Sequence, residues 1–258
     1  MLASARCLLL GLGLVFGVGL APPAGQAAHT SELDKFFKVC SRSDPKLEEC
    51  VVESLNEAKG NIAKGVPSLG LEPLEPVAFR EVRIEEGPAD FQLRFVMRNA
   101  SMAGLANFTA TRARVDFPGR YIEVEMLVPR FLLTGRYSFS GQILTLPING
   151  NGPFNAIVGS VNLTNRIRFS EEKRDGVLYW KAVEYLWDMN MNELHVDFRN
   201  LFRGNKRLGQ YANAFINRHW RAIYQIYKYL VTTNVGYRFK DITNDVLARV
   251  PLDEMFKP

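Results

Sequence analysis

The sequence predicts an α+β fold in which a long C-terminal helix is wrapped by a highly curved antiparallel β-sheet. Between residues 77 and about 198, apolar residues recur at every second position, as in strands with one wet face. Between residues 207 and 232, apolar residues recur every three or four positions and cover much more than one narrow helix face. Only the predicted sheet is large enough to bury such a helix, so the sheet must curve around it.

The first 28 residues have the pattern of a secretory signal peptide. Arg6 is the only charge before an unbroken apolar or glycine run at residues 8–20, and small residues suited to cleavage near Ala27 follow. The run is shorter than the ~20 apolar residues that a membrane span needs. We therefore expect residues 1–28 to be removed, and residues 29–258 to form a single secreted domain with no transmembrane span.

Charge and cysteines narrow the class of protein. The net charge of +5 at pH 7 is too weak, and its signs too mixed, to indicate a nucleic-acid-binding protein. Cys40 and Cys50 form an even pair after the signal peptide, which predicts a disulfide in an exported chain. His29, His195 and His219 lack the spacing of zinc ligands, so we expect neither a metal nor a cofactor.

Three Asn-X-Ser/Thr sequons agree with export. They begin at Asn99, Asn107 and Asn162. Asn162 falls on the predicted wet face of a strand, where a glycan has room. We expect glycosylation at these positions.

A first helix is predicted to begin at Asp44-Pro45, where a capping residue precedes a proline in the first turn. Its apolar face is formed by Leu47, Val51, Leu55, Ala58 and Ile62. Gly65 and Pro67 end the helix, and an extended connector leads to the first strand.

The strands follow as alternating segments. Alternation is clearest at residues 91–97, 122–128, 157–169 and 183–191. The stretch EEKRDG at residues 171–176 is expected to form a charged turn. Long strands with one wet face indicate an antiparallel sheet.

The stretch LPINGNGPF at residues 146–154 looks at first like a phosphate-binding loop. Such a loop needs a helix after it, whereas the residues that follow here alternate as a strand. The lysine and the third glycine of nucleotide-binding motifs are also missing. Asn149-Gly150 supplies the positive φ of a hairpin turn, so we expect a turn between two strands.

The long helix is expected to run over residues 207–232, about 36–40 Å at 1.5 Å per residue. Its central apolar stripe is Leu208, Ala212, Phe215, His219, Ile223, Ile226 and Leu230. Asn234 and Gly236 are expected to end it, and a shorter helix near residues 241–249 closes the chain.

The sequence lacks common enzyme motifs. Neither a G-x-S-x-G nucleophile elbow nor an H-E-x-x-H metal motif occurs. Glu123 and Glu125 mimic a carboxylate pair, but they share the wet face of a strand and are interpreted as surface groups. His219 is either a polar contact for a ligand or a core histidine bonded to the sheet. We do not expect an enzyme.

Large, adaptable side chains are abundant on the predicted inner face. Most such residues are plain core, but a long helix inside a curved sheet also leaves room for a slot lined by methionine and aromatic side chains. The residues predicted to line it are Phe95, Met97, Val183, Tyr185, Trp187, Met189, Ala212, Phe215, His219 and Ile223.

Two long motifs resemble the juvenile hormone-binding and takeout family of secreted insect carriers. They are TGRYSFSGQILTLPINGNGPFNAIVG at residues 134–159 and FRNLFRGNKRLGQYANAFINRHWRAIYQ at residues 198–225. The resemblance runs from Cys40 to Phe256 and implies a tubular lipid-binding fold with an internal hydrophobic tunnel. Dedicated hormone carriers of the family hold a second disulfide in the body of the fold. This sequence has no cysteine after Cys50, which favours the takeout-like branch.

The predicted function is therefore a secreted, monomeric carrier of a small lipophilic molecule, such as a juvenile hormone-like terpenoid or a fatty acid. One alternative is a protein that binds membranes or lipid surfaces through the basic cluster Arg199, Arg203, Lys206 and Arg207. A hydrolase with an unrecognised nucleophile is a third candidate. The sequence identifies neither the ligand nor a receptor.

Overall fold

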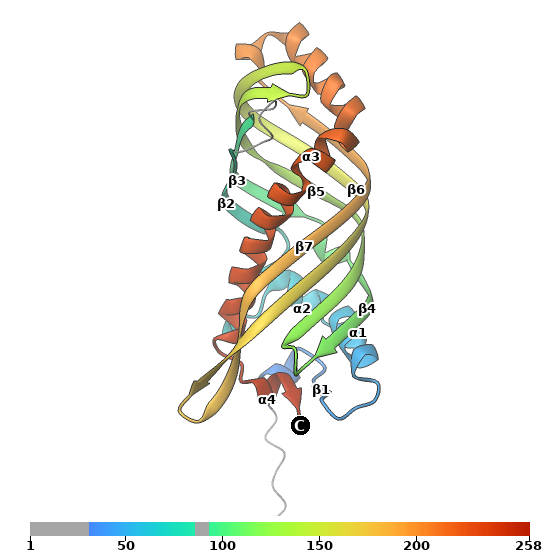
Figure 1. Cartoon of the computed structure of the whole chain (residues 1–258), viewed down its shortest axis with the longest axis vertical. Helices are drawn as coiled ribbons and strands as arrows, with labels where there is room; N and C mark the ends of the chain where they lie inside the picture. Colours follow the sequence, from blue (N-terminus) through green and yellow to red (C-terminus); the bar gives the residue numbers. More distant parts are fainter. Residues whose placement is uncertain (1–30, 86–92) are drawn as a thin grey trace, which may run out of the picture. The chain divides into compact units, whose positions relative to one another are not determined.

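The computed structural model describes residues 31–85 and 93–258, so the predicted signal peptide lies outside the described residues. In this part of the chain, a six-stranded sheet curls around one long helix, α3 (Lys206–Leu247), as the sequence predicts (Figure 1). Shorter helices cluster at the end of the sheet where α3 finishes (Figure 1).

The sheet is antiparallel throughout. Its strands are β2 (Val77–Ile84), β3 (Leu93–Ala103), β4 (Thr109–Asp116), β5 (Tyr121–Ile143), β6 (Leu146–Arg174) and β7 (Val177–Phe198). The hydrogen-bonded order is β2-β3-β5-β6-β7, and β4 pairs separately with β5. The sheet therefore has a free edge at β2 and another at β7, and α3 lies between them.

The remaining elements are short. They are β1 (Cys40–Ser41), α1 (Leu47–Glu57), α2 (Lys59–Lys64), α4 (Leu252–Met255), β8 (Phe256–Lys257) and the 3-10 helices η1 (Leu33–Lys35), η2 (Pro67–Leu69), η3 (Leu105–Asn107) and η4 (Phe202–Gly204). The predicted first helix is thus confirmed, with an interruption at Ala58. The predicted disulfide is also confirmed: Cys40 and Cys50 are bonded and tie β1 to α1.

Of the two turns predicted between long strands, one lies where the sequence predicts it and the other does not. Asp175-Gly176 forms the turn between β6 and β7, within the charged stretch predicted for it, and both residues have positive φ. The β5–β6 turn instead lies at residues 144–145, because Ile143 pairs with Leu146. The turn predicted at Asn149-Gly150 is therefore wrong, since both residues lie inside β6.

The glycines of that stretch serve a close backbone approach. Gly150 is bridged to Leu201. A Cβ at Gly152 would lie 2.4 Å from the carbonyl oxygen of Arg199, closer than any real contact. The chain that leaves β7 can therefore cross β6 and enter α3 only where side chains are missing.

A β-bulge in β7 changes which side chains face inward. Arg168 pairs with Glu184 while Phe169 pairs with Ala182, which leaves Val183 as the extra residue. Val183 is 49% exposed on the outer face, so the prediction that it faces the interior is wrong. An alternating pattern cannot be extrapolated through a bulge, because the extra residue reverses the two faces.

Helix α3 continues past both residues that were expected to end it. Asn234 donates its Nδ2 to the carbonyl of Leu230, one turn back, and stays helical. Gly236 lies against β7, where a Cβ would come within 2.4 Å of the Tyr185 carbonyl oxygen. Gly236 therefore permits close packing, and the separate helix predicted at residues 241–249 is the last part of α3.

Three asparagines of α3 pair with the free edge of β7. In each pair the amide oxygen accepts from a backbone N–H, and the amide nitrogen donates to the backbone carbonyl of the same residue, at 2.8–3.0 Å. The pairs are Asn213 with Phe198, Asn217 with Val196 and Asn244 with Ala182. These side chains replace the strand that β7 lacks, and they attach α3 along its length.

We predict that Asn217→Ala lowers the free energy of unfolding by about 1–3 kcal/mol, because it leaves the N–H and carbonyl of Val196 without their partner. Urea denaturation followed by circular dichroism measures this change. Gln210→Ala, which removes an exposed amide from the same helix, is the matched control and should change stability by less than about 0.5 kcal/mol. Equal effects of the two substitutions would contradict this role for Asn217.

Candidate functional site

Two apolar cavities lie between α3 and the sheet. The larger has a volume of about 330 Å³ and the smaller about 180 Å³. Protein interiors normally contain few voids larger than a water molecule. Cavities of this size inside the main hydrophobic core are therefore candidate binding sites.

The larger cavity lies toward the end of α3, where the N-terminal helices cover it. Its lining residues are Phe37, Leu55, Ile62, Leu69, Leu71, Leu74, Leu105, Phe108, Met126, Leu163, Asn165, Tyr185, Trp187, Phe239, Ile242, Thr243 and Val246. Nearly all of them are apolar. Many come from α1, α2 and the connector at residues 65–76. For this connector the sequence had predicted only a link to the sheet.

Three polar side chains belong to this lining: Asn165, Tyr185 and Thr243. The Tyr185 hydroxyl donates to Asn165 Oδ1 over 3.1 Å, and Asn165 Nδ2 lies 3.6 Å from Met126 Sδ. Burial raises the pKa of the Tyr185 hydroxyl above its usual range, so the hydroxyl remains a donor at neutral pH.

The smaller cavity is mainly aromatic. Its lining residues are Ile84, Phe95, Phe139, Ile143, Leu194, Val196, Phe198, Ile216, Trp220, Ile223, Tyr224, Tyr227 and Val231. Phe95 makes edge contacts with Phe139 and Phe198, at ring-centroid distances of 5.3 and 6.0 Å. The Tyr224 hydroxyl turns away to the backbone carbonyl of Met189, 2.6 Å away. This cavity therefore presents ring faces and edges to a guest.

The two cavities share no lining residue. Along β7, Met189 lies between Trp187 of the larger cavity and Leu194 of the smaller one. Along α3, Val235 lies between the two sets of lining residues, and both Met189 and Val235 are buried. In the described part of the chain, these two cavities occupy part of the space expected as a tunnel, and the buried side chains of Met189 and Val235 lie between their lining residues.

Four of the residues predicted to line a slot lie at these cavities. Tyr185 and Trp187 contact the larger, and Phe95 and Ile223 the smaller. Met97, Met189 and Ala212 are buried in the main core but line neither cavity.

The remaining predicted residues lie elsewhere. Val183 is exposed at the bulge, and His219 is exposed with its ring 4.6 Å from the half-buried ring of Phe215. Neither expectation for His219, a ligand contact or a core histidine, is correct. The buried stripe of α3 is offset by one residue from the predicted one and contains Ile216, Trp220 and Tyr227.

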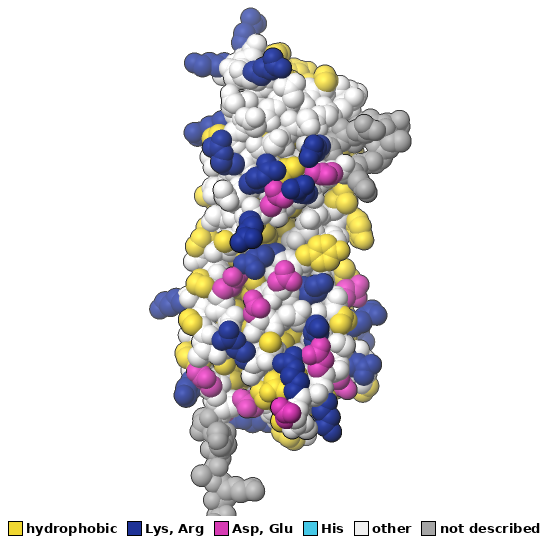
Figure 2. All heavy atoms as spheres, turned by 90° about the vertical axis from the view of Figure 1, so that its left-hand side faces the viewer, with side chains coloured by type: hydrophobic (Ala, Val, Ile, Leu, Met, Phe, Trp, Pro, Cys, Tyr) yellow, Lys and Arg dark blue, Asp and Glu magenta, His cyan; other side chains and the backbone are white. Residues whose placement is uncertain are grey.

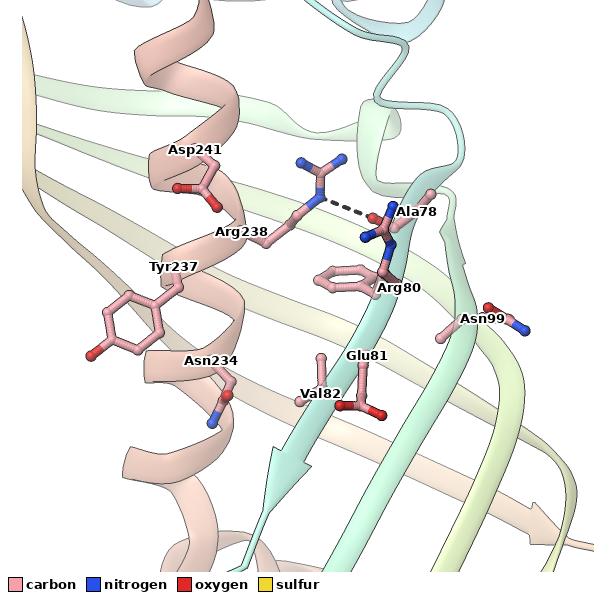
Figure 3. A pocket seen from close by; sticks show the side chains of 11 residues that line it. Ala78, Arg80, Glu81, Val82, Asn99, Asn234, Tyr237, Arg238 and Asp241 are labelled. Carbon is pink, nitrogen blue, oxygen red and sulfur yellow. Dashed lines mark hydrogen bonds between the residues drawn. The ribbon is translucent and has the colours of Figure 1, made fainter.

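A third hollow, of about 860 Å³, lies between α3 and the free edge of β2. Its rim is polar: Arg80 and Glu81 belong to β2, and Asn234, Tyr237, Arg238 and Asp241 belong to α3 (Figure 3). Arg238 spans the gap, since its Nε donates to the carbonyl of Ala78 over 2.9 Å (Figure 3). Its guanidinium also pairs with Glu72. This cleft is unlike the two apolar cavities and suits water or polar groups.

The outer face carries the other sequence-predicted groups. Asn99, Asn107 and Asn162 are all exposed, and glycosylation there remains a prediction. Glu123 accepts hydrogen bonds from Tyr121 and Arg166, at 2.8 and 2.6 Å, and these bonds lower the pKa of its carboxyl. Glu125 pairs with Arg112 at 3.3 Å. The two glutamates are therefore paired with outer-face partners and lie apart from the cavities.

Residues 31–85 and 93–258 contain no group of three or more His, Cys, Asp or Glu side chains placed to hold a metal ion. Over the same ranges, none of the helices is both long and apolar enough to cross a bilayer.

Comparison with known sequences decides the family. The sequence model of the family described as "Haemolymph juvenile hormone binding protein (JHBP)" matches residues 14–257. The chain belongs to this family. The resemblance found in the motifs at residues 134–159 and 198–225 is thereby confirmed.

Two proteins similar to this chain carry the name circadian clock-controlled protein daywake. The protein from Drosophila yakuba is 26% identical over 264 residues, which cover 99% of this chain and 98% of the relative. The protein from Drosophila melanogaster is 24% identical over 229 residues, with 86% of this chain and 87% of the relative covered.

The crystal structure of Takeout 1 from Epiphyas postvittana shows the same fold. It superposes with a TM-score of 0.75 at 21% identity and covers 86% of this chain and all of that chain. The curled antiparallel sheet around a long C-terminal helix is thus the takeout-like fold of the JHBP family.

We predict that stability falls as the pH rises above about 10. Burial raises the pKa of Tyr137 from 10.0 to about 12 and also raises the pKa values of Tyr185 and Tyr224. The unfolded chain loses these protons near pH 10 while the folded chain keeps them, so deprotonation favours unfolding in this range. Urea denaturation between pH 8 and 11 measures the slope, and Tyr137→Phe should reduce it. Full tyrosine ionisation near pH 10 in a chain that remains folded would contradict the burial.

Proposed function

We propose that the protein is a secreted carrier that holds a small lipophilic molecule between α3 and the sheet. The observation that carries this proposal is the larger cavity, about 330 Å³ and lined almost wholly by apolar side chains. An empty apolar cavity lowers stability in proportion to its volume. A ligand that fills it recovers the lost contacts, so the fold gains from an apolar guest.

The size of the cavities fits a small ligand. Binding pockets commonly have volumes of about 300–1,000 Å³, and the larger cavity alone reaches the lower end of this range. Burial of ~400 Å² of ligand surface contributes ~10 kcal/mol before the losses of motion. Those losses bring the expected dissociation constant to between nanomolar and micromolar.

Two further observations support export and a binding role. The Cys40–Cys50 disulfide is typical of proteins that fold in an oxidising compartment. The name of the JHBP family describes binding of a hormone rather than turnover. The proposal is therefore a carrier, not an enzyme.

We predict that Val246→Trp displaces the ligand with little loss of stability. Val246 lines the larger cavity, and a tryptophan there can enter ligand space instead of straining a filled core. Titration with a neutral fluorescent arylamine should show at least a tenfold loss of affinity, while the thermal midpoint changes by only a few degrees. Native mass spectrometry of the wild-type protein should also release a bound apolar molecule.

The matched control is Val183→Trp, which places the same ring on the exposed outer face of β7 and should leave binding unchanged. If Val246→Trp strongly lowers the thermal midpoint but the folded fraction binds the probe normally, the cavity is solid core and the carrier proposal fails.

A second candidate function is attraction to lipid surfaces, and the beginning of α3 favours it. Arg199, Arg203, Lys206 and Arg207 are exposed there, and Leu208 and Tyr211 beside them are 48% and 61% exposed. On the face shown in Figure 2, the upper end carries basic and hydrophobic side chains, and acidic ones lie lower. Anionic membranes attract basic residues that flank exposed apolar groups.

We predict that the protein sediments with anionic phospholipid vesicles at low ionic strength and is released at high salt, because exposed charges are screened. The double variant Arg203→Gln and Arg207→Gln should weaken vesicle binding at low salt without changing arylamine binding in the cavity. Absence of the wild-type protein from the vesicle pellet at low salt would eliminate this second function.

A further inference from the structure

Asn165 is an unusual residue for the interior of this protein. It lies in β6, is only 5% exposed, and is the one buried side-chain amide among the described residues. It also lines the larger apolar cavity. Burying an amide without full hydrogen bonding costs free energy, so a buried amide at a cavity wall needs an explanation.

The partners of Asn165 determine how its amide is oriented. Met126 Sδ, 3.6 Å from the amide nitrogen, can only accept a hydrogen bond, so the nitrogen belongs on that side. The carbonyl oxygen then accepts from the Tyr185 hydroxyl over 3.1 Å. Both partners come from neighbouring strands, β5 and β7, so the sheet holds the side chain from two sides.

This arrangement leaves the hydrogen-bonding capacity of the Asn165 N–H groups largely unsatisfied. The oxygen has a good partner, but two N–H groups share only a thioether, which is a weak acceptor. Leu163, Trp187 and Phe239 of the surrounding wall offer no acceptor side chain, and neither the Thr243 nor the Tyr185 hydroxyl accepts from the amide nitrogen. Thr243 is the other polar lining residue, and it comes from α3. The cavity thus presents a fixed N–H donor in apolar surroundings.

We propose that Asn165 selects the ligand of the larger cavity by donating a hydrogen bond to one neutral oxygen acceptor, such as a ketone or ester carbonyl, on an otherwise apolar molecule. Tyr185 is the positioning residue that orients the amide. An ionised carboxylate is disfavoured, because no lysine or arginine among the described residues lines this cavity to compensate its burial. This inference rests on the carrier function proposed above and adds a chemical class of ligand to it.

The test compares two ligands that differ only in the acceptor. A long-chain methyl ketone and the alkane of equal length compete against the neutral arylamine for the wild-type protein. One net hydrogen bond predicts that the ketone binds about three- to tenfold more tightly. In Asn165→Leu, which keeps the side-chain volume and removes the donor, this preference should disappear while the alkane binds at least as well. Tyr185→Phe should reduce the preference in part.

Thr243→Val is the matched control, since it removes the other polar group from the same cavity and should keep the ketone preference. Loss of the preference in this variant would assign the contact to Thr243 and overturn the proposal. Equal affinity of the wild type for ketone and alkane would overturn it as well. Failure of the wild type to bind any of the three probes would instead count against the carrier function itself.

Infrared spectroscopy on the wild-type protein tests the same hydrogen bond without requiring that any variant folds. The carbonyl stretch of an isotope-labelled ketone shifts to lower frequency when it accepts a hydrogen bond. We expect the bound ketone to absorb at lower frequency than the same ketone in an alkane solvent, which has no donors, and a bound band at the alkane-solvent position would contradict the role of Asn165.

Discussion

The pairing of asparagine side chains with the edge of β7 is the interaction on which the rest of the interior depends. Asn213, Asn217 and Asn244 each satisfy both backbone groups of one β7 residue, so they determine the position of α3 along the strand and its rotation. That rotation directs Ile216, Trp220 and Tyr227 toward the sheet and leaves Phe215 half-buried and His219 exposed. The two apolar cavities lie between α3, held in this way, and the curved inner face of the sheet.

The fold could be predicted from sequence because its two periods are long and distinct. Strands with one wet face and a helix that is apolar nearly all round leave few ways to bury the helix. Because apolar residues lie on nearly all faces of α3, the sequence does not show which face is buried: Phe215 fits an apolar stripe as well as Ile216 does. Asn213 and Asn217, one turn apart, mark the side of α3 that faces β7. This can be recognised only once β7 is known to be an edge strand. Gly236 was misjudged for a related reason, because its role comes from the nearby Tyr185 backbone.

The candidate site was less predictable than the fold, because the side chains that line a cavity have the composition of a filled core. Phe95, Tyr185, Trp187 and Ile223 were found by their position on inner faces, whereas the lining contributed by the connector after α2 was missed. Asn165 carried a visible signal: it falls in step with Val161, Leu163 and Ile167, where an inward polar residue is unexpected. For Val183 the sequence carried no such signal, since only the register of β6 and β7 reveals the bulge that turns this residue outward.

The covering of the sheet edges also affects the tendency of the protein to aggregate at high concentration. An open edge strand is a template for pairing with another chain and leads to aggregation. Here the amides of α3 occupy hydrogen-bonding groups of β7, and at the opposite edge Arg238 occupies the Ala78 carbonyl while Arg80 and Arg83 place charges along β2. The same contacts that hold α3 over the cavities thus hinder the edge strands of this sheet from pairing with strands of other copies of the protein.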